Sequence, residues 1–366
     1  MSRSGPVGVG IIGAGNISNT YLENLSSFPD TTMVAVADLV PEAAQRQAER
    51  FGVRAAGSVE DLLADDDIDI VVNLTIPNAH AEVAIQAVQA GKHVWNEKPL
   101  TVDRPSAQAL LAEASAAGVR VGCAPDTFLG SGLQHTRRRI EEGVAGTPLT
   151  ALVLLQTMGP ESWHPNPAFF FAPGAGPLFD MGPYYLTAVA QIFGPVESLA
   201  ATGSRARETR VVGSGPLAGQ EITVSVPTHV SVLARYQSGQ SAVMIFSFDS
   251  AQGRTMIEIN GSDGTLALPD PNRFDGDLGL KRPFVDPEVL TGPPELSSRG
   301  TGVLEMARAI RADRPHRASG ELAYHVLDTM ISIEEAIGSS SFVTVESTFE
   351  RQPPLPEDWD PHAATL

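Results

Sequence analysis

Short apolar runs alternate with amphipathic segments over residues 7–124, and this alternation constrains the fold more than any other feature of the chain. The amphipathic segments have helical spacing, and Gly52, Gly91 and Gly118 follow them where helices would end. Strands that are apolar throughout must be buried on both faces. The pattern therefore predicts a parallel sheet covered by helices on both sides, with the strands VGVGII, MVAVAD, IDIVVNLT, HVWNE and RVGCA.

After residue 124 the pattern changes. Runs of alternating polar and apolar residues are joined by turns such as Ser238-Gly239 and Asp263-Gly264, which indicates an antiparallel sheet with helices before and after it. A chain of 366 residues has room for about two domains. We therefore expect an α/β domain over residues 1–124 and an α+β domain with an open, mainly antiparallel sheet over residues 125–366.

The net charge restricts the partners of the chain. A formal charge of −18 repels phosphate backbones and anionic lipid surfaces, so we expect neither nucleic acid nor a membrane as partner. Apolar stretches stay well short of the roughly 20 residues that a membrane span requires. One cysteine, Cys123, cannot form an internal disulfide, and the N-terminal segment lacks the pattern of a secretion signal. These features predict a soluble, cytoplasmic protein.

A glycine-rich segment, VGVGIIGAGNIS, follows the first predicted strand. Gly13 and Gly15 stand where a helix begins, and glycine there lets a pyrophosphate approach the unpaired backbone N–H groups. The neighbouring Asn16 and Ile17 belong to the same expected cofactor loop, while Ser18 replaces the usual third glycine. The alternative is a plain turn between strand and helix.

Asp38 ends the second predicted strand. A carboxylate at this point can accept hydrogen bonds from both adenosine ribose hydroxyls, and it repels a 2′-phosphate. The alternative is that Asp38 only helps to start the next helix. Together with the glycine loop, Asp38 favours a Rossmann dinucleotide-binding domain that uses NAD, with NADP as the second possibility.

Two polar segments follow later strands of the same sheet, IPNAH and NEKP. Ligands of an open parallel sheet bind beyond the carboxyl ends of its strands, so both segments point to the nicotinamide end of the cofactor. Pro99 favours an extended conformation for Lys98 and so directs its side chain. The Lys98 ammonium can donate to a substrate hydroxyl and stabilise a developing alkoxide. The alternative is a surface lysine paired with Glu97.

These segments, with GAGPLFDMGPYY further along the chain, resemble the glucose-fructose oxidoreductase, inositol dehydrogenase and rhizopine-catabolism (Gfo/Idh/MocA) family in order and spacing. The resemblance implies a two-domain enzyme that transfers hydride between a nicotinamide cofactor and a sugar, polyol or related cyclic alcohol. It implies that Lys98 touches the reacting hydroxyl. It also implies a homo-dimer or homo-tetramer built on the open sheet. The cofactor contacts expected around these segments include Pro77, Asn78, His80 and Glu97.

The later motif places Asp180 and Tyr184 at the reacting carbon, with Tyr184 standing where the family commonly has an acid/base histidine. Residues four apart on a helix share one face, so both side chains can reach one ligand. A tyrosine can take the proton when a nearby ammonium stabilises its phenolate. The other route is that the proton moves to Lys98 and is relayed through Asp180. The structural alternatives are a helix N-cap for Asp180 and a core position for Tyr184.

Four further residues are candidates for substrate contacts. Asp126 and Thr127 follow the last strand of the first domain, although a local turn would explain the aspartate as well. Trp163 could stack on the apolar face of a sugar, with His164 donating beside it; the alternative is a Pro-rich lid that packs on itself. We expect no metal site, because the spacing of histidine, cysteine and acidic residues does not match one.

These observations predict an NAD-dependent oxidoreductase acting on a hydroxyl or ketone of a sugar, polyol or glycoside. One alternative is an NADP-linked ketosugar reductase. The other is a non-catalytic regulator that senses a dinucleotide or sugar. Retention of the lysine, the aspartate and a tyrosine able to exchange a proton favours an enzyme.

Overall fold

The computed structural model describes residues 4–366 and divides the chain into two compact units. The described part of the first unit comprises residues 4–130, 295–327 and 350–366, and the second comprises residues 131–294 and 328–349. The first unit therefore differs from the expected domain over residues 1–124. The chain crosses into the second unit near residue 130 and later returns twice.

The first unit contains a six-stranded parallel sheet in the order β3-β2-β1-β4-β5-β6. This confirms the predicted α/β class. The one strand that the sequence did not indicate is the short edge strand β3, whose Ala-Ala-Gly sequence lacks an apolar run. The strands are β1 (Val7–Ile12), β2 (Thr31–Ala37), β3 (Ala55–Gly57), β4 (Ile70–Asn73), β5 (His93–Asn96) and β6 (Val121–Cys123).

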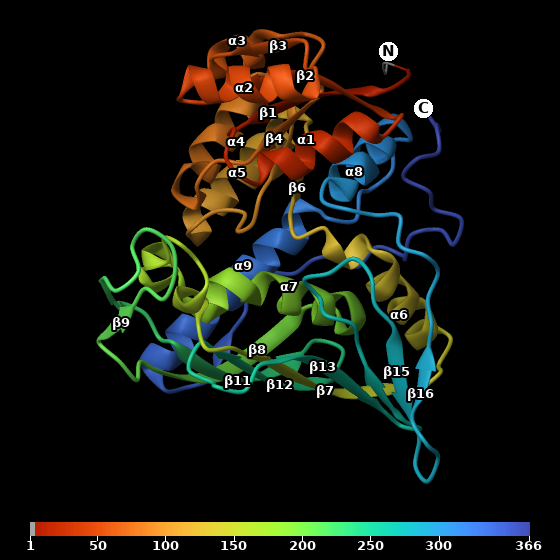
Figure 1. The fold of residues 1–366 in the computed structure, drawn as a ribbon. Helices are drawn as coiled ribbons and strands as arrows, with labels where there is room; N and C mark the ends of the chain where they lie inside the picture. Colours follow the sequence, from red (N-terminus) through yellow and green to blue (C-terminus); the bar gives the residue numbers. More distant parts are fainter. Residues whose placement is uncertain (1–3) are drawn as a thin grey trace. The chain divides into compact units, whose positions relative to one another are not determined.

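Helices lie on both faces of this sheet; in Figure 1 those before residue 120 are red to orange, and the one over residues 301–311 is blue. Gly52 and Gly118 end α2 and α5 in the left-handed conformation that glycine adopts most readily. The helices are α1 (Ser18–Ser27), α2 (Pro41–Phe51), α3 (Val59–Ala64), α4 (His80–Gln89), α5 (Arg104–Ala117) and α8 (Thr301–Arg311), with the short 3₁₀ turns η1 (Pro77–Ala79) and η2 (Thr127–Leu129).

Helix α8 belongs to the first unit because its buried side packs on the sheet. A Cβ at Gly302 would collide with the Trp95 ring, so glycine permits this close approach. The C-terminal segment is fastened to α8 as well. Arg308 donates to the carbonyl oxygens of Asp360 and Ala363 at 3.0 and 2.7 Å. The C-terminal segment thus completes the first unit.

The second unit is built on a nine-stranded sheet in the order β16-β15-β14-β13-β7-β12-β11-β8-β17. Its neighbours pair antiparallel except β7 and β12, which agrees with the expected mainly antiparallel sheet. The strands are β7 (Pro148–Gln156), β8 (Val196–Ser204), β11 (His229–Tyr236), β12 (Ser241–Ser247), β13 (Arg254–Gly261), β14 (Thr265–Ala267), β15 (Leu278–Lys281), β16 (Glu288–Leu290) and β17 (Val343–Thr344).

A separate two-stranded hairpin of β9 (Thr209–Val211) and β10 (Glu221–Thr223) also belongs to this unit. Figure 1 shows α7 lying along one face of the large sheet. The helices are α6 (Ser131–Glu141), α7 (Gly176–Phe193) and the second half of α9 (Gly320–Ser339), with the 3₁₀ turns η3 (Pro160–Ser162) and η4 (Ala168–Phe171). Within residues 4–366, none of the helices combines the length and the apolar character of a membrane span.

Candidate functional site

The glycine loop joins β1 to α1 at the point where the strand order of the sheet reverses, which is where open α/β sheets bind ligands. Gly13 has φ of +107°, and a Cβ there would lie 2.8 Å from the Leu74 carbonyl group of β4's exit loop. At Gly15 a Cβ would meet no atom of residues 4–366 within 4 Å. The fold therefore requires glycine at position 13. At position 15, glycine leaves space in which a ligand can approach the backbone.

The start of α1 fits the pyrophosphate of a dinucleotide. Within the described residues, α1 has no acidic residue in its first turn and no side-chain cap, so its positive end is uncompensated by its own side chains. Ser18, in the place of the third glycine, is fully buried and donates to the Gly15 carbonyl oxygen at 2.7 Å. The serine thus preserves the tight turn. Asn16 and Ile17 lie between these points, as expected.

Asp38 links the glycine loop to the start of α2. Its Oδ2 accepts a hydrogen bond from the Ala14 N–H at 2.7 Å, and its Oδ1 accepts one from the Val40 N–H at 2.8 Å. The second bond closes a turn just before α2, whose N-cap is Val40 without a side-chain cap, and the first ties the carboxylate to the cofactor loop. Leu39 and Ile76 are 95% and 69% exposed, and the sequence reading did not single out these apolar residues at the ends of β2 and β4.

The PNAH segment divides into two parts. Pro77 and Asn78 are exposed on η1, as cofactor contacts require. His80 is 1% exposed instead, with Nδ1 2.7 Å from the Pro99 carbonyl oxygen and Nε2 3.0 Å from the Thr75 carbonyl oxygen. Burial lowers the pKa of His80 and favours the neutral ring, which donates through one nitrogen at a time. His80 therefore braces the Lys98-Pro99 turn rather than facing a ligand.

Two buried asparagines support the same turn from below. Asn73 and Asn96 end β4 and β5, and the Asn73 amide donates to Asn96 Oδ1 at 3.0 Å. Asn96 in turn donates to the Leu100 carbonyl oxygen at 2.9 Å, and Asn73 Oδ1 accepts from Thr75. The signal was present in the sequence as a polar residue closing each apolar run.

Glu97 holds the other side of the turn. Its Oε2 accepts from the Lys98 N–H at 2.9 Å, and its Oε1 accepts from the Tyr21 hydroxyl of α1 at 2.9 Å. Burial, followed by the nearby carboxylates of Glu97 and Asp126, raises the pKa of Tyr21, so its hydroxyl remains a donor. Glu97 thus restrains the Lys98 turn, and because it is only partly buried, the cofactor contact expected of it stays a prediction. The Lys98 side chain itself is half-buried.

Asp126 has a different role from the substrate contact expected of it. It is fully buried, and its Oδ2 accepts from the N–H groups of Gly300 and Gly302 at 2.9 and 3.1 Å, where α8 begins. Burial raises the pKa of this carboxyl. Thr127 is 1% exposed. Because these bonds join segments more than 170 residues apart, a local sequence reading could not find them.

Asp180 and Tyr184 both lie on α7 in the second unit. The helix begins at Gly176, so Asp180 stands in its second turn, which excludes the N-cap alternative. Tyr184 is 8% exposed, whereas Tyr185 is fully buried and packs edge-on against Phe246. Both tyrosines are buried on α7, as the core alternative for Tyr184 expects, and Tyr184 keeps the larger exposed fraction of the two.

Trp163 and His164 follow η3 in the loop between β7 and α7. Trp163 is 66% exposed, and His164 packs edge-on against the rings of Trp163, Phe169 and Phe170. The Asn166 N–H donates to His164 Nδ1 at 3.1 Å, which leaves the proton of the neutral ring on Nε2. The loop therefore packs partly on itself and still presents an open indole face. Among residues 4–366, no three histidine, cysteine or acidic side chains are grouped to hold a metal.

Two family models match the chain. Residues 7–124 match the model described as "Oxidoreductase family, NAD-binding Rossmann fold", and residues 133–267 match that of the GFO/IDH/MocA C-terminal domain. The two matches together span more than half of the chain and meet close to the crossing between the units.

Curated relatives cover most of the chain at low identity. A 1,5-anhydro-D-fructose reductase from Ensifer adhaerens is 26% identical over 346 residues, covering 92% of this chain and 98% of the relative. A myo-inositol 2-dehydrogenase from Thermotoga maritima is 26% identical, covering 70% of this chain and 74% of the relative. A dTDP-3,4-didehydro-2,6-dideoxy-alpha-D-glucose 3-reductase from Actinomadura kijaniata is 29% identical, covering 72% of this chain and 75% of the relative.

Solved structures share the fold over nearly the whole chain. Levoglucosan dehydrogenase in complex with NADH and L-sorbose has a TM-score of 0.81 at 21% identity, covering 94% of this chain and 100% of that one. An NAD binding oxidoreductase from Klebsiella pneumoniae has a TM-score of 0.81 at 22% identity, covering 93% and 99%. Taken with the glycine loop, Asp38 and the braced Lys98 turn, the family matches show that this chain is an NAD-binding oxidoreductase belonging to the Gfo/Idh/MocA family.

Proposed function

We propose that this enzyme transfers hydride between NAD(H) and a hydroxyl or ketone carbon of a sugar, polyol or glycoside. The observation that carries the proposal is the Lys98 turn. It lies at the carboxyl end of β5, in the same sheet edge as the glycine loop, and buried side chains restrain it on both sides. The named activities of the curated relatives, an inositol dehydrogenase and sugar reductases among them, support this substrate class.

In the proposed reaction, Lys98 donates to the oxygen of the reacting carbon. An ammonium at that point stabilises alkoxide character, which is what an alcohol develops as its C–H hydride departs. Bound nicotinamide supplies the carbon that accepts or returns this hydride. The glycine loop and Asp38 would hold the cofactor through its pyrophosphate and ribose.

Asp180 and Tyr184 are proposed to handle the proton. They lie one turn apart on α7, so their side chains share a face of that helix. Tyr184 takes the hydroxyl proton directly, or Lys98 takes it after its ammonium has given a proton to Asp180. Trp163 is proposed to stack on the apolar face of the substrate ring, with His164 Nε2–H donating to a hydroxyl.

A screen of NAD reduction across aldoses, inositols and glycosides tests the proposal, with Lys98→Ala as the decisive variant. We expect Lys98→Ala to lower kcat by about 10³-fold or more while NADH affinity stays within about twofold, because Lys98 acts on the substrate oxygen. Lys281→Ala, at an exposed lysine of β15, is the matched control and should keep full activity.

Three outcomes would contradict this reading. An unchanged kcat in Lys98→Ala would remove the lysine from the mechanism. NADH binding without turnover on any substrate of the screen would identify a sensor instead of an enzyme. Clearly tighter binding of NADPH than of NADH in parallel fluorescence titrations would overturn the role given to Asp38.

We also propose that the enzyme is a cytoplasmic homo-oligomer that pairs through the open sheet face. On this face Leu233 and Val243 are 55% and 44% exposed and lie opposite one another on β11 and β12. Val243 also lies opposite Leu152 of β7, so the apolar side chains are continuous across three strands. Light scattering of Leu233→Lys should show a lower mass than the unchanged protein; equal masses would exclude this face.

A further inference from the structure

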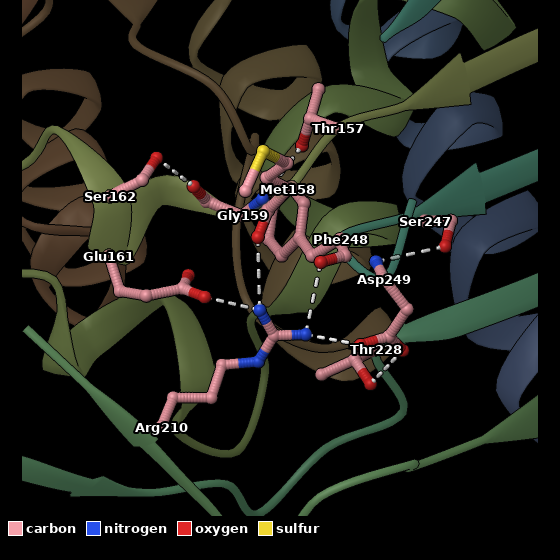
Figure 2. Close-up of polar contacts among 10 residues, drawn as sticks. All are labelled: Thr157, Met158, Gly159, Glu161, Ser162, Arg210, Thr228, Ser247, Phe248 and Asp249. Atoms are coloured by element: carbon pink, nitrogen blue, oxygen red, sulfur yellow. Dashed lines mark hydrogen bonds and ion pairs between the residues drawn. The ribbon is translucent and has the colours of Figure 1, made fainter. Parts of the chain in front are cut away.

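A buried arginine joins three segments of the second unit. Arg210 of β9 is 4% exposed, and Figure 2 shows its guanidinium between Glu161 and Asp249. Nη1 donates to the Glu161 carboxylate and, at 3.1 Å, to the Met158 carbonyl oxygen. Nη2 donates to the Asp249 carboxylate and, at 3.0 Å, to the Phe248 carbonyl oxygen. One side chain thus fastens the loop after β7 to the β9–β10 hairpin and to the residues after β12.

The partners of Arg210 are themselves fixed. Thr228 donates to Asp249 Oδ2 at 2.6 Å, and the Gly213 N–H donates to the Glu161 carbonyl oxygen at 2.7 Å. Gly159, with φ of +99°, lies so close to Glu161 that a Cβ would collide with its carboxylate. Several hydrogen bonds therefore hold the turn at residues 157–162 at once, while Arg210 Nε and Glu161 Oε2 are buried without a hydrogen-bond partner among residues 4–366.

The far end of the same loop rests on a small apolar cluster. This cluster joins η4 to the hairpin, and Arg210 lies over the Phe171 ring, 5.3 Å from its centroid. Its members are Phe170, Phe171, Val212, Ile222, Val224 and Phe248. Both ends of the segment 157–171 are thus anchored on one hairpin. Between the anchors stand the exposed rings of Trp163 and Phe169, the latter 54% exposed.

A buried guanidinium with two carboxylates costs free energy of desolvation, so it is not needed if its role is only to stabilise the loop. Desolvation of the three charges offsets much of their attraction, and a packed apolar side chain would stabilise the loop as well. The arginine also fixes the orientation of the loop, because its planar guanidinium donates to several acceptors at once. Lysine in its place would supply charge without that geometry.

We propose that Arg210 is a positioning residue for substrate recognition: it holds the loop of Trp163 and His164 in the arrangement that binds the substrate ring. This inference rests on the proposed function, in which that loop contacts the substrate. Since Arg210 acts through Trp163 and His164 and not on the reacting carbon, its loss weakens substrate binding and leaves hydride transfer intact.

The test uses Arg210→Lys and Arg210→Met, together with Trp163→Ala and the control Arg205→Met. Arg205 lies just before the same hairpin and pairs with Glu208, but its side chain is 40% exposed. With the best substrate of the screen, we expect each Arg210 variant to raise KM by about fivefold to tenfold, with kcat within about twofold and the KM for NAD unchanged. Trp163→Ala should do the same, and Arg205→Met should change neither constant.

The double variant Trp163→Ala/Arg210→Met decides whether the two residues act together. We expect its KM to match that of Trp163→Ala alone, because Arg210 acts through the loop. Multiplied effects, or a fall in kcat alone, would overturn the positioning role. A normal KM in Trp163→Ala would overturn it too, while leaving the Lys98 chemistry standing.

Hydrogen exchange of Arg210→Lys provides a readout that needs no substrate. We expect faster exchange across residues 157–172 and unchanged protection in residues 4–130. Unchanged exchange in the loop would overturn the inference even if the enzyme were active. The same measurement applies if no substrate is found, so failure of the proposed function and failure of this inference give different results.

Discussion

The turn that carries Lys98 and the loop that carries Trp163 are held in opposite ways. Several groups brace the Lys98 turn: the neutral amides of Asn73 and Asn96, which close adjacent strands, and the Glu97 carboxylate beside Lys98. One charged side chain, Arg210, holds the Trp163 loop through partners 39 to 52 residues away. The restraint on the Lys98 turn is spread over many bonds, whereas the restraint on the Trp163 loop is concentrated in one side chain.

This difference matches the chemistry proposed for each region. A group that acts on a reacting atom must be held to a fraction of an ångström, and many short buried bonds achieve that. A ring that stacks on a substrate face tolerates small displacements and requires its general orientation. Single substitutions should therefore affect folding more in the first region and substrate binding more in the second.

The strongest challenge to the first region is at Gly13. Gly13→Ala forces a Cβ into the Leu74 carbonyl group at a φ that alanine rarely adopts, so we expect a loss of about 3 kcal/mol or more in unfolding free energy. Gly15→Ala is the matched variant, since space is open at that point. It should keep stability and weaken NAD binding by about tenfold, because the Cβ would stand in the path of the pyrophosphate. Urea unfolding and NADH titration measure both, and equal stability of the two variants would contradict the role of Gly13.

A smaller effect is expected at Asn96. Asn96→Ala leaves the Leu100 carbonyl oxygen and one Asn73 donor without their partner in a buried setting, at a cost of about 2 to 3 kcal/mol. Asn78→Ala, at an exposed position two residues before His80, is the control for stability and should change it by less than about 0.5 kcal/mol. Chemical denaturation followed by fluorescence compares them. If the two variants unfold alike, the asparagine pair does not brace the turn.

The smallest effect concerns the C-terminal segment. Burial on its own would raise the pKa of Asp30, but hydrogen bonds from Thr365, Arg308 and Leu366 outweigh it and lower the pKa. The ionised carboxylate therefore stabilises the folded state above about pH 4, and this contribution is lost as the pH falls through the lowered value. Asp30→Asn should cost about 1 kcal/mol at pH 7 and progressively less in acid. A difference from the unchanged protein that stayed constant between pH 7 and pH 3 would exclude this linkage.

The features that the sequence predicted correctly rest on local signals. The strands of the first sheet, and the place of the glycine loop between β1 and α1, each follow from residues within one short segment. β8 escaped prediction because its Ala-Ala-Thr-Gly core is not strongly apolar, although it pairs along its whole length with β11. Arg210 escaped because nothing near it in sequence shows that Glu161 and Asp249 meet there.

The roles of several predicted site residues also depend on distant partners. His80 and Glu97 were chosen as cofactor contacts from their place after strands, and in the structure both restrain the Lys98-Pro99 turn. Asp126 was placed by the same rule, but α8 reaches its carboxylate from a part of the chain that no local pattern connects to it. A position directly after a strand thus predicts that a residue lies near the site. Its contacts with distant segments determine its role there.

The return of the chain to its first unit affects how the protein can be made. Because α8 and residues 350–366 are part of the cofactor-binding unit, that unit cannot close while the ribosome is still translating the second one. The glycine loop and the Lys98 turn are translated early. The hydrogen-bond partners of Asp30 and Asp126 are translated only near the C-terminus. Acquisition of NAD binding should therefore be a late event in synthesis, reached only when nearly the whole chain is available.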